Sequence, residues 1–457
     1  MTTSNITFPL ELVEAFVEQL APGSGIALEE EIFQTLVSCT LASKKFSFAA
    51  RKRLFSTLVI GRNWKHTSQI IDWHWRMMRK GRTEEASRRI NSFLGLLADE
   101  RSSDLALMIR RLHIIVDDER IILRQATNLH ELLKVLSHRA HKLSILRVHG
   151  RYTFSWTTIP QETADGLYAL CRSLSVNHLS FSGVYNIPYT IASVQEYPHL
   201  RYIDFEESEF AGNDAGMAAE TTISPATSLI AGHLDVLTGL PKYGSYEICY
   251  TSHGQINIVG IDITIRLRDE SQRLNQLLSD ERIRSSLRYC CCTCRDTHEL
   301  LSTTKAIDFG TMVLLRQLTI YLRVGLDDDI PEITTDITSA MNTLIDCLYY
   351  GNTKSALQEI KVTLDTEYDL YERTSMFDAV DFSSLQRLRI DSLRKKHPLI
   401  QSTQFCIRIG LLPYDSGPEV KSSVEEIVRK LITDAIALPP VDESFLPQIH
   451  ICAEKGY

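Results

Sequence analysis

The sequence has no long apolar run, no excess of basic residues and none of the short motifs that mark common active sites. Because no stretch of about eighteen consecutive apolar residues occurs, we expect no membrane span. Lys and Arg total 49 against 57 Asp and Glu, a net charge of −8. This balance argues against a nucleic-acid partner, since such proteins neutralise phosphates with excess basic side chains. A phosphate-binding Gly-rich loop, His-Glu-x-x-His and Gly-x-Ser-x-Gly are all absent, so we predict that the chain is not an enzyme.

The first residues also lack the features of a secretory leader. Met1 to Thr7 contains no basic residue and is followed by an amphipathic segment instead of a continuous apolar one. Proteins that stay inside the cell keep their thiols reduced, so the ten cysteines do not indicate a disulfide framework. We therefore expect a cytoplasmic and/or nuclear protein.

One cysteine cluster leaves a second chemistry open. Cys290, Cys291, Cys292 and Cys294 are followed by His298, and Cys291 to Cys294 is a Cys-x-x-Cys step. A structural zinc site normally has a second ligand pair at a recognisable distance, and none is nearby. We expect no metal or cofactor and place the cluster at the end of a partly buried helix. Cys291, Cys294 and His298 are the residues that a zinc or thiol site would use.

The amino-terminal segment predicts three short helices and a strand. Pro9 suits a first helical position, and Leu12, Val13, Phe16, Val17 and Leu20 form one apolar stripe after it. A second stripe runs from Ile32 to Leu41, and a third helix is expected from Phe46 to Phe55. Thr57 to Ile60 then indicates a strand.

The order of residues in this segment resembles a known module. Phe8-Pro9-Leu10-Glu11-Leu12-Val13 resembles the start of F-box domains, and Cys39 to Phe46, followed by Ala50 to Phe55, resembles their later part. The second segment is similar to the large F-box family of mushroom-forming fungi. Phe8, Phe46 and a longer turn at Pro22 to Gly25 depart from the usual pattern.

The resemblance implies a function for these residues. An F-box docks its protein on the Skp-type adaptor of a cullin ubiquitin ligase, while the rest of the chain selects a target protein. The adaptor-binding positions that match are Pro9, Leu10, Leu12, Val13, Leu41 and Phe46. This is recognition of a helix in a groove, in which a few apolar anchors supply most of the binding energy.

Beyond Ile60 the pattern predicts a helical linker and then a loose recurrence of strands and helices. Helices are expected at His66 to Lys80 and Glu84 to Ala98. Short alternating strands are expected at Leu112 to Val116, Leu143 to Val148, His178 to Phe181, Leu200 to Phe205, Leu318 to Leu322, Leu357 to Leu364 and Leu385 to Ile390, with a further β-rich piece at Ile256 to Leu267. The helices between them are expected at Asn128 to Ala140, Glu162 to Leu174, Glu270 to Tyr289, Ile337 to Tyr350 and Val420 to Ile436.

Several of these strands contain a phrase that resembles the Leu-x-x-Leu-x-Leu core of a leucine-rich repeat. Examples are Leu143 to Val148, Leu200 to Phe205, Leu315 to Ile320 and Leu385 to Ile390. Their spacing is uneven, whereas regular repeats of this class are about 20 to 29 residues long. Such strands and helices cover their apolar faces only by stacking on their neighbours.

We therefore predict an α/β protein with a three-helix F-box-like domain at 1–60, a helical linker at 61–104 and an irregular leucine-rich-repeat-like solenoid with a mainly parallel sheet at 105–457. The expected partners are a Skp-type adaptor, a cullin scaffold and a target protein of unknown identity, with no nucleic acid and no membrane. Two alternatives stay open, namely an interaction scaffold outside any ligase and a zinc or thiol protein built on Cys290 to His298.

Overall fold

The structure, a computed structural model, divides the chain into two compact units, residues 1–227 and 228–457. It describes residues 9–20, 30–61, 82–99, 104–116, 121–172, 175–192, 197, 199–211, 240–251, 256–266, 268–294, 309–324, 338, 342, 345–346, 348–350, 354–367, 387, 393–411, 422, 426, 430 and 448–453. The predicted domain at 105–457 therefore has parts in both units. The predicted helix at His66 to Lys80 lies outside the described residues.

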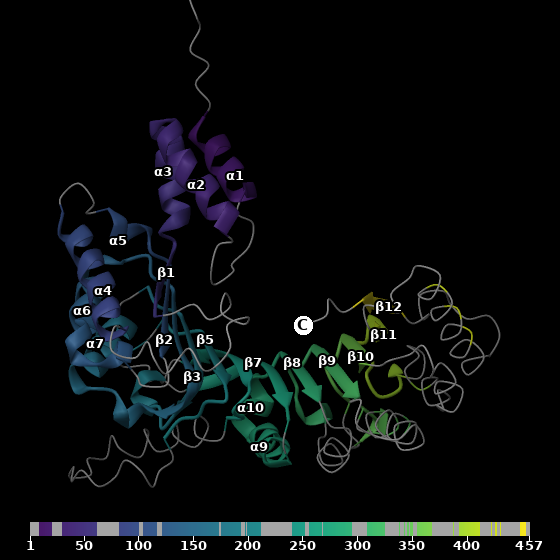
Figure 1. The fold of residues 1–457 in the computed structure, drawn as a ribbon. Helices are drawn as coiled ribbons and strands as arrows, with labels where there is room; N and C mark the ends of the chain where they lie inside the picture. Colours follow the sequence, from purple (N-terminus) through teal and green to yellow (C-terminus); the bar gives the residue numbers. More distant parts are fainter. Residues whose placement is uncertain are drawn as a thin grey trace, which may run out of the picture. The chain divides into compact units, whose positions relative to one another are not determined.

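The first unit begins with helices and continues with parallel strands (Figure 1). The helices are α1 Leu10–Leu20, α2 Glu30–Ala42, α3 Lys44–Leu54, α4 Arg82–Ala98, α5 Leu105–Met108, α6 Leu129–Arg139 and α7 Gln161–Cys171. Short 3-10 turns lie at η5 Ile121–Leu123, η6 Gln125–Thr127, η7 Trp156–Thr158 and η8 Tyr189–Ala192. The strands are β1 Thr57–Ile60, β2 Arg111–Val116, β3 Ile145–Ser155, β4 His178–Tyr185 and β5 Tyr202–Glu206.

These five strands pair in parallel in chain order, from β1 to β5. The pairing places Leu112, Leu146, Leu179 and Ile203 side by side, and each is at most 1% exposed. Two residues further along each strand a second buried row follows, made of Ile114, Val148, Phe181 and Phe205. Alternate residues of a strand point to the same side, so these rows form one apolar face.

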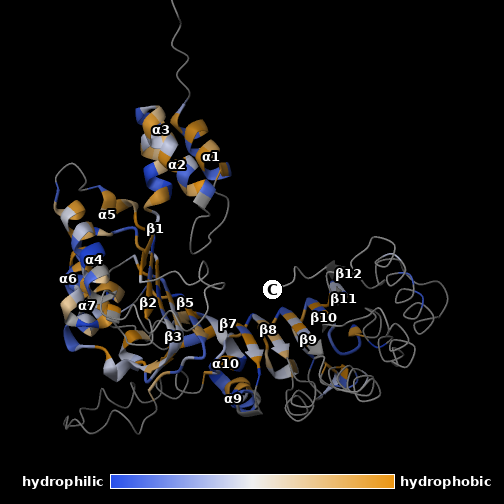
Figure 2. Ribbon diagram, in the orientation of Figure 1, coloured by the Kyte–Doolittle hydropathy of each residue, from blue (hydrophilic) through white to orange (hydrophobic). Residues whose placement is uncertain are grey.

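Helices cover that apolar side of the sheet. Figure 1 shows α4, α6 and α7 along one side of the strands of the first unit. Helix α6 buries Leu129, Leu132, Leu133 and Leu136, a stripe at helical spacing. Figure 2 shows hydrophobic residues along α1, α2 and α3 and along β1. Fully burying one such aliphatic side chain stabilises a fold by about 1.5–3 kcal/mol, so the stacked rows contribute strongly to the stability of this unit.

The same backbone contact joins the starts of neighbouring parallel strands from β1 to β5 and from β8 to β11. The carbonyl oxygen of the residue just before one strand accepts hydrogen bonds from two backbone N–H groups at the start of the next strand. The carbonyl oxygen of Ser56 accepts these bonds from the start of β2, that of Ser144 from β4 and that of Arg316 from β10. The same role is played by the carbonyl oxygens of Arg110, Asn177, Arg288 and Gln358 for β3, β5, β9 and β11. Two positions before a strand the side chain is a buried apolar residue, for example Ile109, Leu143, Leu315 and Ile400. The first leucine of the predicted Leu-x-x-Leu-x-Leu phrase therefore lies two residues before the strand, and the other two lie in the two buried rows of the strand.

The second unit continues with strands β6 Gly244–Tyr250, β7 Ile256–Ile265, β8 Tyr289–Cys294, β9 Gln317–Val324, β10 Glu359–Glu367, β11 Ser402–Leu411 and β12 Gln448–Ala453. Strands β7 to β12 pair in parallel, and β6 pairs with β7 in the antiparallel direction. The helical elements are α9 Arg268–Ser279, α10 Glu281–Ser286 and the 3-10 turn η11 Phe309–Thr311. In Figure 1, α9 and α10 lie on one side of β7 and β8.

The structure confirms the coarse class, a mixed α/β protein with a mostly parallel sheet, and corrects several elements. The single helix predicted at Glu270 to Tyr289 is two helices, because Asp280 caps a new helix through its side chain, which accepts a hydrogen bond from Arg282 N. The strand predicted at Leu385 to Ile390 contains one described residue, Arg387, which is in a 3-10 turn, and the strand after β10 is β11. Of the helices at Ile337 to Tyr350 and Val420 to Ile436, only scattered helical residues are described.

Candidate functional site: an apolar surface on three helices

Helices α1, α2 and α3 form a small core of their own. Its buried members are Val13, Val17, Leu36, Ala49 and Ala50, with Ile32, Cys39, Phe46 and Leu54 packed partly against them. Two of the five buried side chains are alanines, so this core is shallow. A segment of about fifty residues buries a smaller share of its surface than a larger domain does.

Local interactions fix the order of these helices. Ser43 is the N-cap of α3, and its hydroxyl accepts a hydrogen bond of 3.3 Å from Phe46 N. Lys52 Nζ lies 2.8 Å from Glu14 Oε1 and joins α3 to α1. The Phe16 and Phe46 rings contact each other edge to face, with centroids 6.0 Å apart. The arrangement is thus held by contacts that do not use the outward apolar side chains of α2.

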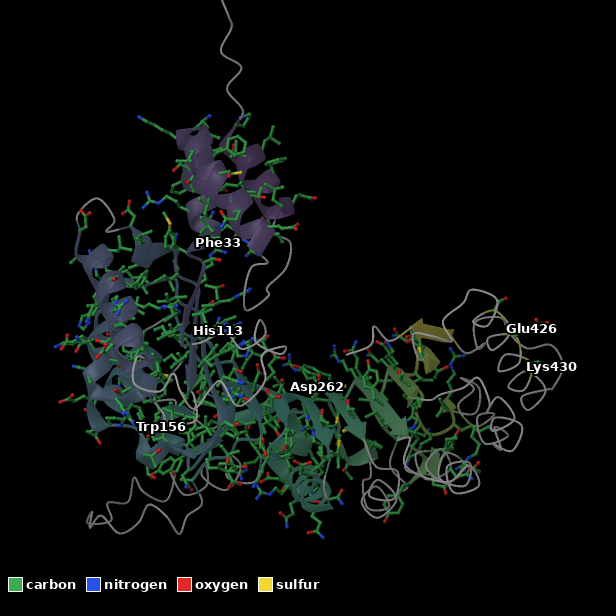
Figure 3. The ribbon with its side chains drawn as sticks, viewed as in Figure 1. Phe33, His113, Trp156, Asp262, Glu426 and Lys430 are labelled. Atoms are coloured by element: carbon green, nitrogen blue, oxygen red, sulfur yellow. The ribbon has the colours of Figure 1, made fainter. Side chains whose placement is uncertain are left out.

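Five large apolar side chains on these helices are largely exposed. Leu12 is 59% exposed, Phe16 52%, Phe33 42%, Leu41 85% and Phe48 47%. We call this set the apolar surface. It contains five large residues, whereas the buried core contains three residues larger than alanine. All three aromatic members are phenylalanine, which has no polar group to direct to water. Phe33 is labelled in Figure 3.

The residues predicted from the sequence are exposed, half-buried or buried. Leu12 and Leu41 are exposed, Pro9 is also exposed, and Leu10 and Phe46 are half-buried. Val13 is 3% exposed in the core, so its side chain is not available to a partner. Sequence reasoning did not select Phe16, Phe33 or Phe48. Phe16 lies one turn after Leu12, and this i, i+4 spacing is the signal that could have found it.

A pocket of about 420 Å³ adjoins the apolar surface at the junction of α2, α3 and α5. Leu41, Phe48 and Met108 supply apolar lining, and Lys44, Arg51 and Asp104 supply charges. Polar atoms come from Thr40, Ser43 and Ser47. A partner side chain that reaches this junction meets both apolar and charged lining residues.

The cysteine cluster is not at the end of a helix but forms strand β8. Cys290 and Cys294 take inward positions beside Leu318 and Leu322 of β9, where the neighbouring strands carry aliphatic residues. Cys291 and Cys294 are three residues apart, so they point to opposite sides of the strand and do not share a ligand. His298 lies outside the described residues. Within the described part of the chain, no group of three or more His, Cys, Asp or Glu side chains is placed to hold a metal ion.

The pKa values of three thiols of β8 are raised. Burial raises the pKa of Cys291 and that of Cys294. For Cys292, the hydrogen bond with Cys290 and then burial raise the pKa. Since the thiolate is the reactive and metal-binding form, these directions argue against thiol or zinc chemistry at β8. Cys290 and Cys294 act as small apolar residues of the inner row.

One buried Ser–His pair has the look of a catalytic pair but is structural. Ser355 Oγ hydrogen-bonds His397 Nδ1, and His397 Nε2 lies 2.9 Å from the carbonyl oxygen of Leu348. A carbonyl only accepts, so Nε2 carries the proton and the Ser355 hydroxyl donates to Nδ1. Ser355 is 4% exposed and His397 is fully buried, which leaves a substrate no access. The pair joins the turn before β10 to the turn before β11.

In the described part of the chain, no helix is both long and apolar enough to cross a membrane. Comparison with protein-family models found no family that matches the chain, and comparison with curated proteins found no significant match.

Proposed function

We propose that this chain is a target-recognition adaptor of a Skp/cullin/F-box type ubiquitin ligase. In this proposal residues 8–60 act as an F-box-like module that docks on a Skp-type adaptor. The strands and helices that follow act as an irregular leucine-rich-repeat-like solenoid that binds a target protein.

The observation that carries the proposal is the exposure of the apolar surface around a small core. Leu41 is 85% exposed and Leu12 is 59% exposed, although burying a leucine side chain is favourable by about 1.5–3 kcal/mol. A partner that covers these side chains recovers this free energy. Exposed apolar residues that cluster on one small module are typical of a protein interaction site.

The recurring strand geometry supports the second part of the proposal. The same three apolar positions recur in β2 to β5 and in β9 and β10, and one backbone carbonyl oxygen links neighbouring strand starts from β1 to β5 and from β8 to β11. Parallel strands stacked in chain order with helices on one side are the expected arrangement for leucine-rich-repeat-like stacking. In this proposal the target binds the opposite side of the strands, which carries mostly polar residues.

The test is co-purification of the full chain with a Skp-type adaptor and a cullin. We expect the wild-type chain to bring down both proteins, and Leu41→Asp and Leu12→Asp each to weaken adaptor binding at least tenfold, since hot-spot truncations commonly cost about 2 kcal/mol or more. Thr35→Asp is the matched control. Thr35 is exposed and lies two residues after Phe33, so it faces another side of α2.

The outcomes separate the readings. A wild-type chain that binds no Skp-type adaptor would sink the proposal. Co-purification of the Skp-type adaptor without a cullin would favour the alternative in which the chain is an interaction scaffold outside a ligase. Equal losses for Leu41→Asp and Thr35→Asp would show that the apolar surface is not the contact. Unchanged melting temperatures are required for all three variants, so that lost binding is not lost folding.

A further inference from the structure

The side of the first unit's sheet that is opposite the apolar rows carries two arginines and two histidines on two neighbouring strands. On β2 this side carries Arg111, His113 and Ile115, and on β3 it carries Ile145, Arg147 and His149. No acidic residue lies among these six positions. The next strand, β4, adds His178, Ser180 and Ser182 on this side, so it also supplies no negative charge.

His113 and Arg147 are register partners at the centre of this region. His113 is 4% exposed, and its Nε2 atom has no hydrogen-bond partner within the part of the chain that the structure describes. The buried Nε atom of Arg147 also has no hydrogen-bond partner among the described residues. Buried polar atoms in folded proteins nearly always have a partner, so two such atoms on adjacent residues call for an acceptor or ligand. Figure 3 labels His113 among the strands of the first unit.

The acidic residues of this side are on β5 and have other partners. Asp204 Oδ2 lies 2.5 Å from His178 Nε2, and Glu206 Oε2 accepts a hydrogen bond of 3.1 Å from Ser182. Neighbouring strands are about 4.8 Å apart, so β5 is roughly 14 Å from β2. Glu206 still acts on the pKa of His149, and Asp204 is the register partner of Ser180. Each of these two acids, however, already has a hydrogen-bond partner of its own on β4.

We propose that His113, Arg147 and Ser180 form a binding site for an oxyanion, a carboxylate or phosphate group carried by a bound protein segment. This inference adds a chemical class of target to the proposed function. It depends on that function only for the statement that the anion belongs to a target protein. The Arg147 guanidinium supplies paired N–H donors, which match the two oxygens of such a group. The His113 ring and the Ser180 hydroxyl, which lie beside Arg147 on β2 and β4, supply further donors.

The electrostatics of the region support an anion. Burial lowers the pKa of Arg111, and the nearby charges of Arg53, Arg147 and Arg110 lower it further. Burial also lowers the pKa of His113 to about 4, with Arg147 and Arg111 adding to the effect. Like charges held close together disfavour one another, and a negative group between them removes that repulsion. The neutral His113 ring still donates a hydrogen bond from whichever nitrogen holds its proton.

The experiment measures anion binding to the full chain at pH 7.5 and constant ionic strength, without any adaptor protein. Isothermal titration with inorganic phosphate is one arm, and titration with a hexaglutamate peptide is the other. We expect saturable binding in at least one arm and no binding of chloride. Stronger binding of phosphate indicates a phosphorylated partner, and stronger binding of the peptide indicates an acidic one.

Arg147→Gln is expected to weaken anion binding roughly tenfold or more, because it removes a charge-assisted contact. Arg124→Gln is the matched control, since Arg124 is exposed in the same unit and outside these strands. Should Arg147→Gln fail to fold, ¹⁵N NMR of the histidine rings in the wild-type chain replaces it, with the His113 signal expected to shift on anion addition. No saturable binding in either arm, binding unchanged by Arg147→Gln, or an unmoved His113 signal would each overturn the inference. None of these outcomes depends on adaptor binding.

Discussion

The Tyr289 hydroxyl donates a hydrogen bond of 2.6 Å to Glu247 Oε2 across the backbone of Gly260. Gly260 is the register partner of Glu247 on β6 and of Tyr289 on β8, so the tyrosine ring spans one whole strand. A Cβ atom built on Gly260 would lie 1.8 Å from Cζ of Tyr289. The glycine therefore makes room for a side-chain link between two strands that do not pair with each other.

The first prediction follows from this contact. Gly260→Ala should displace the Tyr289 ring, break its bond to Glu247 and reduce the free energy of unfolding by about 1–3 kcal/mol, the usual cost of overpacking. Urea unfolding of the full chain checks it. Gly95→Ala is the control, because nothing lies within 4 Å of a Cβ at Gly95 in α4. That change should raise helix stability by about 0.5–1 kcal/mol. Equal effects of the two substitutions would contradict the packing described for Tyr289.

The second prediction concerns acid sensitivity at His397. Burial lowers the pKa of His397 to about 4, from 6.5 for the unfolded chain. Between these values the unfolded chain binds a proton that the folded chain does not, so this histidine's contribution falls as pH drops from 6.5 to 4 and is intact above 6.5. His397→Gln should flatten the fall of melting temperature over that range. His141→Gln, at an exposed site, should leave the slope unchanged. Equal slopes for wild type and His397→Gln would show that the buried ring is not the source.

The elements that sequence patterns predicted well are those whose side chains alternate or repeat with one period. Strand β2 and helix α6 were expected within one residue of their bounds, because their apolar residues alternate or recur every turn. Strand β8 was missed because cysteines stand where its neighbours carry Ile and Leu. Strand β11 was also missed. Its apolar residues alternate at Phe405, Ile407 and Ile409, but the segment at Leu385 to Ile390 matched the Leu-x-x-Leu-x-Leu pattern better and was predicted as the strand instead.

The candidate site was predictable in part for a different reason. Helical spacing shows that Leu12, Val13, Phe16 and Val17 share one stripe, but it does not show which edge of that stripe meets the neighbouring helices. The structure buries Val13 and Val17 and leaves Leu12 and Phe16 outward. The placement of His113 beside Arg147 comes from strand register, which depends on pairing between segments far apart in the chain.

The third prediction tests the role of the β8 cysteines. Cys294 is 1% exposed in the inner row, so Cys294→Ser should cost about 1–3 kcal/mol by burying a hydroxyl, whereas Cys249→Ser at an exposed site should change stability by less than about 0.5 kcal/mol. In the native chain, Cys294 should react with a thiol reagent more slowly than Cys249, as read by peptide mapping. A chelator should leave the melting temperature unchanged. A large fall on chelation would revive the metal interpretation of this strand.

The fourth prediction compares one substitution at two sites on the same helix. Leu36 is fully buried among α1, α2 and α3, and Leu41 is 85% exposed. Leu36→Ala should reduce the free energy of unfolding of the three-helix segment by about 2–5 kcal/mol, because it leaves a cavity in a small core. Leu41→Ala should change it by less than about 0.5 kcal/mol. Hydrogen exchange of the α2 amides measures both effects within the full chain.

The same pair separates folding from binding. Leu41→Ala should weaken capture of a Skp-type adaptor while the α2 amides stay as protected as in the wild type, because its side chain contributes to the interface and little to the core. Leu36→Ala should weaken capture only in proportion to the loss of protection. If Leu41→Ala destabilises α2 as much as Leu36→Ala does, then Leu41 is packed in the folded chain. The apolar surface would then lack its most exposed residue.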